Sequence, residues 1–186
     1  VKNYNYFGDE DLFLHEAIPG HHFQIALQQE NKNLPNFRKF NWFGAYGEGW
    51  ALYTESLGKE LGLYKDPYQY FGMLSNEMHR AIRLVVDTGI HAKGWTREQA
   101  IQYSLKNEAE SEASITSEIE RYMAVPGQAL SYKIGQLKIL DLRQKAQSQL
   151  KNKFDIKIFH QKVLESGVLP IALLEKKIDL WIVSGK

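Results

Sequence analysis

The chain has 186 residues, 44% hydrophobic and 24% charged, a balance typical of one globular domain with a substantial core. Its 23 Lys and Arg residues and 22 Asp and Glu residues give a net charge of +1. That near-neutral balance excludes nucleic-acid binding or a polybasic membrane anchor driven by excess positive charge. There is no cysteine, so only His, Asp or Glu could hold a metal ion. No apolar run approaches the ~20 residues of a membrane span.

Hydrophobic residues recur with helical spacing along nearly the whole chain, and no convincing alternating pattern predicts a strand. Prolines and glycines, which interrupt helices, divide this pattern into segments. The joints are Pro19-Gly20, residues 44–49, Asp66-Pro67, Lys93-Gly94 and Pro126-Gly127. We therefore predict one all-α domain over residues 1–186, built from about seven helices.

The first helical stretch carries a motif close to the zinc-peptidase pattern H-E-x-x-H. Residues 15–22 read His-Glu-Ala-Ile-Pro-Gly-His-His. The zinc pattern needs two His four residues apart, but the residue four positions after His15 is Pro19. Because a proline cannot continue the helical hydrogen bonds, and because Gly20 permits unusual backbone angles, we predict a departure from helix over residues 17–20.

Treating residues 18–19 as a bulge restores the H-E-x-x-H spacing. His15 and His21 then become two ligands of one metal ion, and Glu16 becomes the general base that takes a proton from water. His22 remains an alternative to His21 as the second ligand. A second interpretation is a proline-kinked helix whose histidines are ordinary polar side chains.

The next stretch, residues 45–55, offers a third ligand, as in zinc peptidases that take a Glu from the following helix. Glu48 and Glu55 lie two turns apart on one helix face; we predict Glu48 as the ligand and keep Glu55 as the alternative. Gly47 and Gly49 flank Glu48 and cost roughly 1 kcal/mol each in helix stability. Such a local conflict favours a functional site, although a solvated acidic face would have the same pattern.

The helix predicted over residues 68–90 has two stripes of side chains. We expect the apolar stripe to face the core; it consists of Phe71, Leu74, Met78, Ile82 and Val85. The second stripe has steps of three and four residues, which suit either a ladder of salt bridges or a site. It consists of Glu77, Arg80, Leu84, Asp87 and His91.

Ordinary signals mark the remaining helices. Thr96 and Gln99 form a capping box that starts a helix running to about residue 105. On the helix after the Pro126-Gly127 turn, we expect a buried stripe at Leu130, Ile134, Leu137 and Leu140. Pro170 suits the first turn of the last helix. The buried positions of that helix are predicted to be Leu173, Leu174, Ile178 and Trp181.

Four blocks of sequence, in order, resemble the bacterial domain-of-unknown-function family 885: residues 15–22, 48–55, 80–95 and 121–135. Members of this family are long, mostly helical proteins, often secreted or lipoproteins. They are regarded as relatives of helical zinc peptidases such as thimet oligopeptidase and angiotensin-converting enzyme. The resemblance implies the C-terminal part of such a protein, located in the periplasm or secreted, with a missing N-terminal half. A start at Val1 without a signal peptide agrees with a fragment.

The resemblance also implies roles for further side chains and one Zn²⁺ as cofactor. Helical zinc peptidases stabilise the oxyanion with a His and a Tyr, and His91 and Tyr132 are the candidates here. Arg121 and Gln128 are candidates for substrate binding, since a guanidinium can pair with a carboxylate through two parallel hydrogen bonds. A structural ion pair with Glu48 or Glu55 is the alternative role for Arg121.

We therefore expect a zinc-dependent peptidase that acts on short peptides, with the peptide and the missing half of the protein as its partners. One alternative is a non-catalytic peptide-binding or scaffold domain with a degenerate metal motif. Another is a metal-free hydrolase that uses the paired carboxylates of Glu16 and Glu48. His79 and His160 have ordinary helical neighbours and are expected to be structural.

Overall fold

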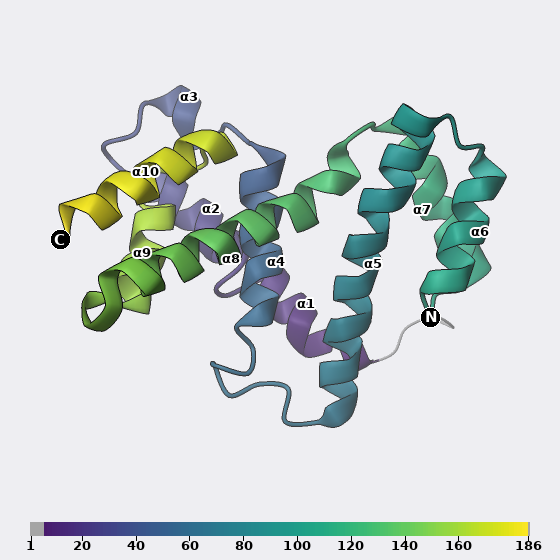
Figure 1. The fold of residues 1–186 in the computed structure, drawn as a ribbon, viewed down its shortest axis with the longest axis horizontal. Helices are drawn as coiled ribbons and strands as arrows, with labels where there is room; N and C mark the ends of the chain where they lie inside the picture. Colours follow the sequence, from purple (N-terminus) through teal and green to yellow (C-terminus); the bar gives the residue numbers. More distant parts are fainter. Residues whose placement is uncertain (1–5, 186) are drawn as a thin grey trace.

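The computed structural model describes residues 6–185 and confirms the all-α class, since that range contains helices and no strand (Figure 1). Its α-helices are α1 (Asp9–Glu16), α2 (His21–Glu30), α3 (Asn36–Lys39), α4 (Gly44–Ser56), α5 (Pro67–Lys93), α6 (Arg97–Asn107), α7 (Glu112–Ala124), α8 (Ser131–Leu150), α9 (Ile156–Leu164) and α10 (Ile171–Ser184). Three 3₁₀ turns accompany them within the described range: η1 (Tyr6–Gly8), η2 (Gln128–Leu130) and η3 (Lys151–Lys153).

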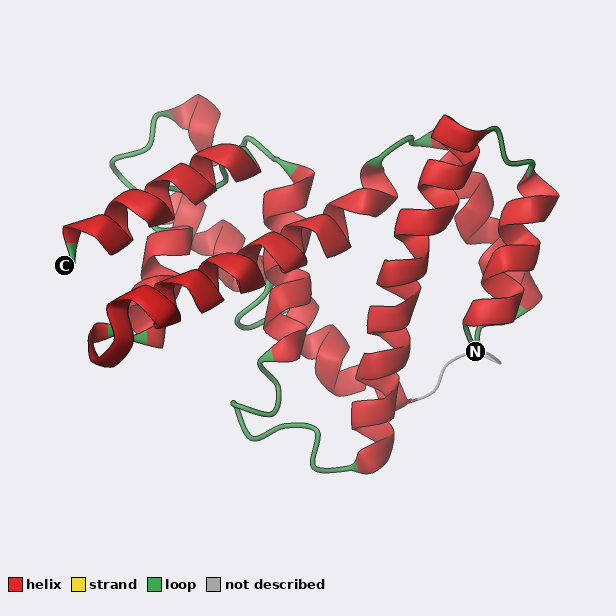
Figure 2. Cartoon of the chain, in the orientation of Figure 1, coloured by secondary structure: helices red, strands yellow, loops and turns green. Residues whose placement is uncertain are grey.

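The helix number expected from the sequence, about seven, was too low, because periodicity over long windows misses short helices. The four residues of α3 and the separate α1 and α2 are examples of helices that the pattern merged or passed over. Figure 2 shows loops and turns of different lengths joining these helices. None of the described helices is both long and apolar enough to cross a membrane.

Buried apolar residues form two larger clusters, one on each side of the molecule. The first joins α4, α8, α9 and α10 through residues such as Trp50, Ile139, Phe159 and Ile178. The second joins α5, α6 and α7 through residues such as Ile82, Ala100 and Ile119. Figure 1 shows α8 extending from the neighbourhood of α5 towards α9 and α10. Of the helices that carry the candidate ligands, α4 belongs to the first cluster, and α1 and α2 pack against α4.

Two glycines allow α4 and α8 to cross with their backbones in contact. A Cβ atom added at Gly49 would lie 2.4 Å from the Cα atom of Gly135. One added at Gly135 would lie 1.8 Å from the carbonyl oxygen of Ala45. Because neither distance leaves room for a methyl group, only glycine fits at the crossing. This contact fixes the position of the helix that carries Glu48 and Glu55.

The apolar stripe predicted to face the core on α5 is wrong in four of its five positions. Ile82 is buried, but the exposed residues include Phe71 (59%), Leu74, Met78 and Val85. The buried face instead includes Gly72, Met73, Arg83, Val86 and Asp87. Periodicity selects the most apolar stripe, whereas here hydrogen bonds make a polar face suitable for burial. For example, Asp87 Oδ2 accepts a hydrogen bond from the main-chain N–H of Gly127 (3.1 Å).

The buried stripe of α8 was also misplaced by the sequence pattern. Ile134 and Leu137 are exposed, and Leu130 and Leu140 are only half-buried. The buried residues of α8 are Gly135, Gln136, Ile139, Leu142 and Ala146. The close approach of α4 at Gly135 decides which face of α8 turns inward. The spacing of apolar residues cannot predict that contact.

Other local signals are confirmed. Thr96 and Gln99 form the predicted capping box at the start of α6, which ends at Asn107. Pro170 directly precedes α10. The buried residues of α10 include three of the four expected ones, Leu174, Ile178 and Trp181, whereas Leu173 is exposed.

We expect Gly135→Ala to lower the free energy of unfolding by about 3 kcal/mol, because the added methyl group forces α4 and α8 apart. For a chain of this size, that loss lowers the melting temperature by roughly 10 °C. Thermal unfolding followed by far-ultraviolet circular dichroism measures it. Gly44→Ala is the matched control at the same helix pair, because its Cβ would meet only the side chain of Ser131. A Gly135→Ala melting temperature at or above that of the parent would contradict the close crossing.

Candidate metal centre

The backbone leaves the helical path between α1 and α2, which confirms the predicted departure over residues 17–20. Two side chains of α4 hold the chain at this break. Thr54 Oγ1 donates a hydrogen bond to the carbonyl oxygen of Leu14 (2.8 Å), before the break. Trp50 Nε1 donates one to the carbonyl oxygen of Pro19 (2.8 Å), within it. The shape of the break is therefore set by α4.

Gly20 lets the chain double back onto the end of α1. A Cβ atom added at Gly20 would lie 1.9 Å from the carbonyl oxygen of His15 and 2.3 Å from that of Leu14. Any other residue would force α1 and α2 apart. The tight return brings the ring of His21 beside that of His15, with 4.8 Å between the ring centroids.

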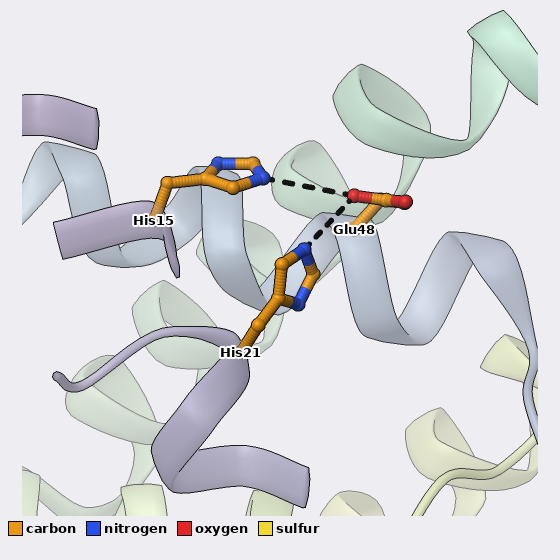
Figure 3. Close-up of side chains that lie close together, drawn as sticks. All are labelled: His15, His21 and Glu48. Atoms are coloured by element: carbon orange, nitrogen blue, oxygen red, sulfur yellow. Dashed lines mark hydrogen bonds and ion pairs between the residues drawn. The ribbon is translucent and has the colours of Figure 1, made fainter. Parts of the chain in front are cut away.

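Figure 3 shows His15 and His21 converging on Glu48, which projects from α4. Glu48 Oε2 lies 3.2 Å from His21 Nε2 and 3.7 Å from His15 Nε2. One ligand atom from each of the three residues lies within 4.8 Å of the other two. Only small side-chain movements separate this arrangement from three donors gathered at about 2.1 Å from one metal ion.

The alternative ligands, His22 and Glu55, occupy other positions. His22 is exposed on α2 and does not belong to the group. Glu55 lies behind His15 and accepts a hydrogen bond from His15 Nδ1 through its Oε1 atom (2.6 Å). Because Nδ1 carries that proton, Nε2 is the nitrogen of His15 that a metal would take. The geometry therefore favours His21 over His22 and Glu48 over Glu55.

The centre places two carboxylates next to the same imidazole. Burial opposes the charged form of His15, but hydrogen bonds with Glu48 and Glu55 outweigh it and raise the pKa of His15 to about 9. Burial also opposes the charged form of Glu48, yet hydrogen bonds with His15 and His21 lower the pKa of Glu48 to about 2. The surroundings thus favour a positive charge between the carboxylates, and a divalent cation can supply it in place of a proton.

Tyr132 lies close to the histidines, whereas Gln128 and Arg121 lie behind it. The ring centroids of Tyr132 and His15 are 6.2 Å apart. Gln128 Nε2 donates a hydrogen bond to Tyr132 Oη (3.3 Å), and Arg121 Nη1 donates one to Gln128 Oε1 (3.2 Å). Arg121 also forms an ion pair with Glu118 (2.8 Å). Its guanidinium is therefore engaged within the protein, as in the structural alternative.

The structure does not bring His91 to the centre. His91 is exposed near the end of α5, where its Nε2 donates a hydrogen bond to the main-chain oxygen of Tyr122 (2.9 Å). Of the two residues predicted to stabilise an oxyanion, only Tyr132 lies beside the motif histidines. Glu16 is the exposed last residue of α1 and directly follows His15.

Two arginines of α5 lie against the ring of Tyr132, and sequence reasoning gave neither of them a role. The Cζ atoms of Arg80 and Arg83 lie 5.0 Å and 4.8 Å from the Tyr132 ring centroid. Arg83 donates hydrogen bonds to Tyr122 Oη and to Glu118 Oε2, both at 2.8 Å. Arg80 belongs to the polar stripe of α5, which was predicted from the sequence. The stripe alone does not predict that Arg80 faces Tyr132.

His79 and His160 make contacts of a structural kind. His79 Nδ1 pairs with a carboxylate oxygen of Glu108. His160 Nε2 lies 2.7 Å from Tyr53 Oη, and Tyr53 Oη in turn accepts a hydrogen bond from Arg143. Burial and the charge of Arg143 lower the pKa of His160 to about 4, so the Tyr53 hydroxyl donates to a neutral imidazole.

Comparison with known families decides where the chain belongs. The model of the family described as "Bacterial protein of unknown function (DUF885)" matches residues 1–178. The chain belongs to this family. The resemblance found in the four sequence blocks is thereby confirmed at the level of the family. A comparison of the DUF885 chain with the curated proteins finds no match.

Two solved structures are similar to the DUF885 chain over most of its length. One is a crystal structure of a "putative lipoprotein" from Colwellia psychrerythraea, with 50% identity and a TM-score of 0.93 over 96% of this chain and 31% of that one. The other is a "putative lipoprotein of unknown function" from Shewanella oneidensis, with 29% identity and a TM-score of 0.85 over 94% and 32%. The DUF885 chain thus spans less than a third of each.

His160 is expected to make the stability of the fold depend on pH. Its pKa is about 4 in the folded chain, below the ordinary value of 6.5. As the pH falls through this window, the unfolded chain binds a proton that the folded chain does not, so stability decreases. We expect a loss of roughly 2 kcal/mol, after allowing for partial solvent contact of the ring.

Urea unfolding at pH values on both sides of this window measures the effect. The matched variant His160→Gln keeps a polar group near Tyr53 but removes the titration. It should lose less stability than the parent on acidification. An equal loss in parent and variant would show that other groups control the acid response.

Proposed function

We propose that the DUF885 chain supplies the metal-binding part of a zinc-dependent hydrolase that cleaves the peptide bonds of short peptides. The observation that carries the proposal is the convergence of two imidazole nitrogens and one carboxylate oxygen, from His15, His21 and Glu48. Two His and one Glu, with a fourth position left open, are the donor set of a class of catalytic zinc sites. Glu55, hydrogen-bonded to the other nitrogen of His15, is the kind of outer partner that zinc-bound histidines usually have.

The residues around this centre support a division of labour. Bound zinc would lower the pKa of a water molecule and polarise the substrate carbonyl. Glu16, next to His15 in the chain, would take a proton from the water and pass it to the leaving amine. Tyr132, beside the His15 ring, would donate a hydrogen bond to the carbonyl oxygen as negative charge develops there.

The resemblance to helical zinc peptidases such as thimet oligopeptidase and angiotensin-converting enzyme supports the same reaction. Because the chain spans less than a third of the two similar structures, we assign the second wall of the substrate cleft to a part of the protein beyond these residues. The names of these two proteins favour a location outside the cytoplasm, in the periplasm or as a secreted or lipid-anchored protein.

Zinc content is the first test of the proposal. The chain purified without chelator and supplied with Zn²⁺ is expected to hold one ion, measured by plasma mass spectrometry. His21→Ala should lose the ion and the matched variant His22→Ala should keep it, because His21 lies against Glu48 whereas His22 is exposed and outside the ligand group. Glu55→Gln should weaken zinc affinity by about 10- to 100-fold, as measured against a competing chelator.

Two outcomes would contradict this ligand set. One is retention of zinc by His21→Ala, and the other is its loss from His22→Ala. A parent chain that takes up no zinc would instead favour the peptide-binding or scaffold domain.

Turnover separates the remaining roles. Glu16→Gln should keep zinc and lose hydrolysis of a quenched fluorescent peptide, because the glutamine side chain has the shape of glutamate but cannot accept the proton. Tyr132→Phe should keep zinc and lower kcat by about 10², with KM nearly unchanged, as expected for a contact made mainly in the transition state. His91→Gln is the control, since His91 lies at Tyr122 rather than at the centre. A kcat of Tyr132→Phe equal to that of the parent would remove Tyr132 from the mechanism.

A further inference from the structure

Arg80 has a charged side chain with one buried donor that lacks a hydrogen-bonding partner among the described residues. It is half-buried on α5, and its Nε atom is buried with no hydrogen-bond partner among residues 6–185. Carboxylates within 4.0 Å pair with Arg83, Arg97, Arg121 and Arg143. In the part of the chain that the structure describes, no carboxylate within that range pairs with Arg80. Burial and the nearby charge of Arg83 lower the pKa of Arg80. Asp11 and Glu55 act on Arg80 only through longer-range electrostatics. An anionic ligand would therefore supply the acceptor that the Nε–H donor lacks among the described residues.

The guanidinium of Arg80 lies against Tyr132, the residue whose ring neighbours His15, and it borders a cavity. Its Cζ atom lies 5.0 Å from the ring centroid of Tyr132, whose ring in turn lies 6.2 Å from that of His15. Arg80 also lines a cavity of about 380 Å³, whose lining does not include the three candidate ligands or Tyr132. Phe7 and Phe71 contribute apolar walls to this cavity, and its two acidic residues are exposed to solvent.

We infer that Arg80 binds the C-terminal carboxylate of a peptide, so that the proposed hydrolase removes residues from the C-terminal end instead of cutting internally. A guanidinium binds a carboxylate through two parallel, charge-assisted hydrogen bonds, and partial exclusion of water strengthens them. Because Arg80 and His15 both neighbour the ring of Tyr132, a short peptide with its scissile carbonyl at the centre would place its C-terminal end beside Arg80. The direction of trimming rests on the proposed function, whereas carboxylate binding at Arg80 does not.

Matched peptides test the binding step. Zinc is left out of this test because a free carboxylate could bind directly to the metal ion. Isothermal titration calorimetry on the chelator-treated chain compares acetyl-Ala-Ala-Leu with its C-terminal amide. We expect the free acid to bind at least about tenfold more tightly than the amide. Arg80→Gln should reduce this preference to less than about twofold.

Two further variants separate the geometry of Arg80 from charge in general. Arg80→Lys should keep part of the preference, because it keeps the charge but loses the two parallel donors. Arg97→Gln is the matched control and should keep the whole preference, because its guanidinium is already paired with Glu120. Melting curves by circular dichroism establish that each variant is folded. If Arg80→Gln does not fold, a preference in Arg80→Lys equal to that of the parent overturns the inference.

A third peptide distinguishes the source of the carboxylate. Acetyl-Ala-Ala-Glu amide carries its carboxylate on a side chain and should bind no better than the leucine amide. If it binds as tightly as the free acid, the site reads any carboxylate and the C-terminal assignment is overturned. An unchanged preference in Arg80→Gln overturns the inference too, as does a parent chain that binds the free acid no better than its amide.

The failure of this inference is distinguishable from the failure of the proposed function. A chain that takes up no zinc when supplied with it, yet prefers the free acid, would refute zinc-dependent hydrolysis and keep the Arg80 site. A chain that holds zinc and shows no such preference would keep the hydrolase and refute the C-terminal assignment.

Discussion

The candidate centre depends on the hydrogen bonds by which α4 holds the C-terminal end of α1, where the helix stops. Glu55 holds the ring of His15 by a 2.6 Å hydrogen bond, and Thr54 holds the main chain one residue earlier. The same helix presents Glu48 two turns before Glu55. Because the Gly49 contact seats α4 directly on α8, these groups are positioned by the packed interior and not by a surface loop. A shift of α4 would displace Glu48 and at the same time change the orientation of the His15 ring.

Local chemistry explains why the sequence predicted much of this centre. Pro19 removes a helical donor whatever its surroundings, so the break between α1 and α2 could be predicted without knowing the fold. The pairing of His15 with His21 follows from that break, since the two residues bulged out restore a known ligand spacing. The choice between Glu48 and Glu55 could not be made from spacing, because both lie on one helix face. It depends on which carboxylate lies in front of His15 and which lies behind it.

The faces of α5 and α8 show where sequence patterns reach their limit. Apolar periodicity predicts that Phe71 turns inward, yet tertiary contacts bury the face of α5 that carries Asp87 and Arg83. The partner of Arg121 was equally hidden: it is Glu118, one turn earlier on the same helix, and not an acidic residue of the motif helices. Such pairings depend on how the side chains are oriented after the helices pack. The periodicity of a single sequence does not predict those orientations.

Gln128 determines which way the hydroxyl of Tyr132 points. Arg121 donates to the amide oxygen of Gln128, so the amide NH₂ must be the group that faces Tyr132. The phenol oxygen is therefore an acceptor on that side, and its hydrogen is directed elsewhere. A free phenol hydroxyl can rotate about its C–O bond, whereas the hydroxyl of Tyr132 is oriented by Gln128. Gln128 is oriented by Arg121, which is held by its ion pair with Glu118. Little rotational freedom then remains to be lost when an acceptor arrives in front of Tyr132.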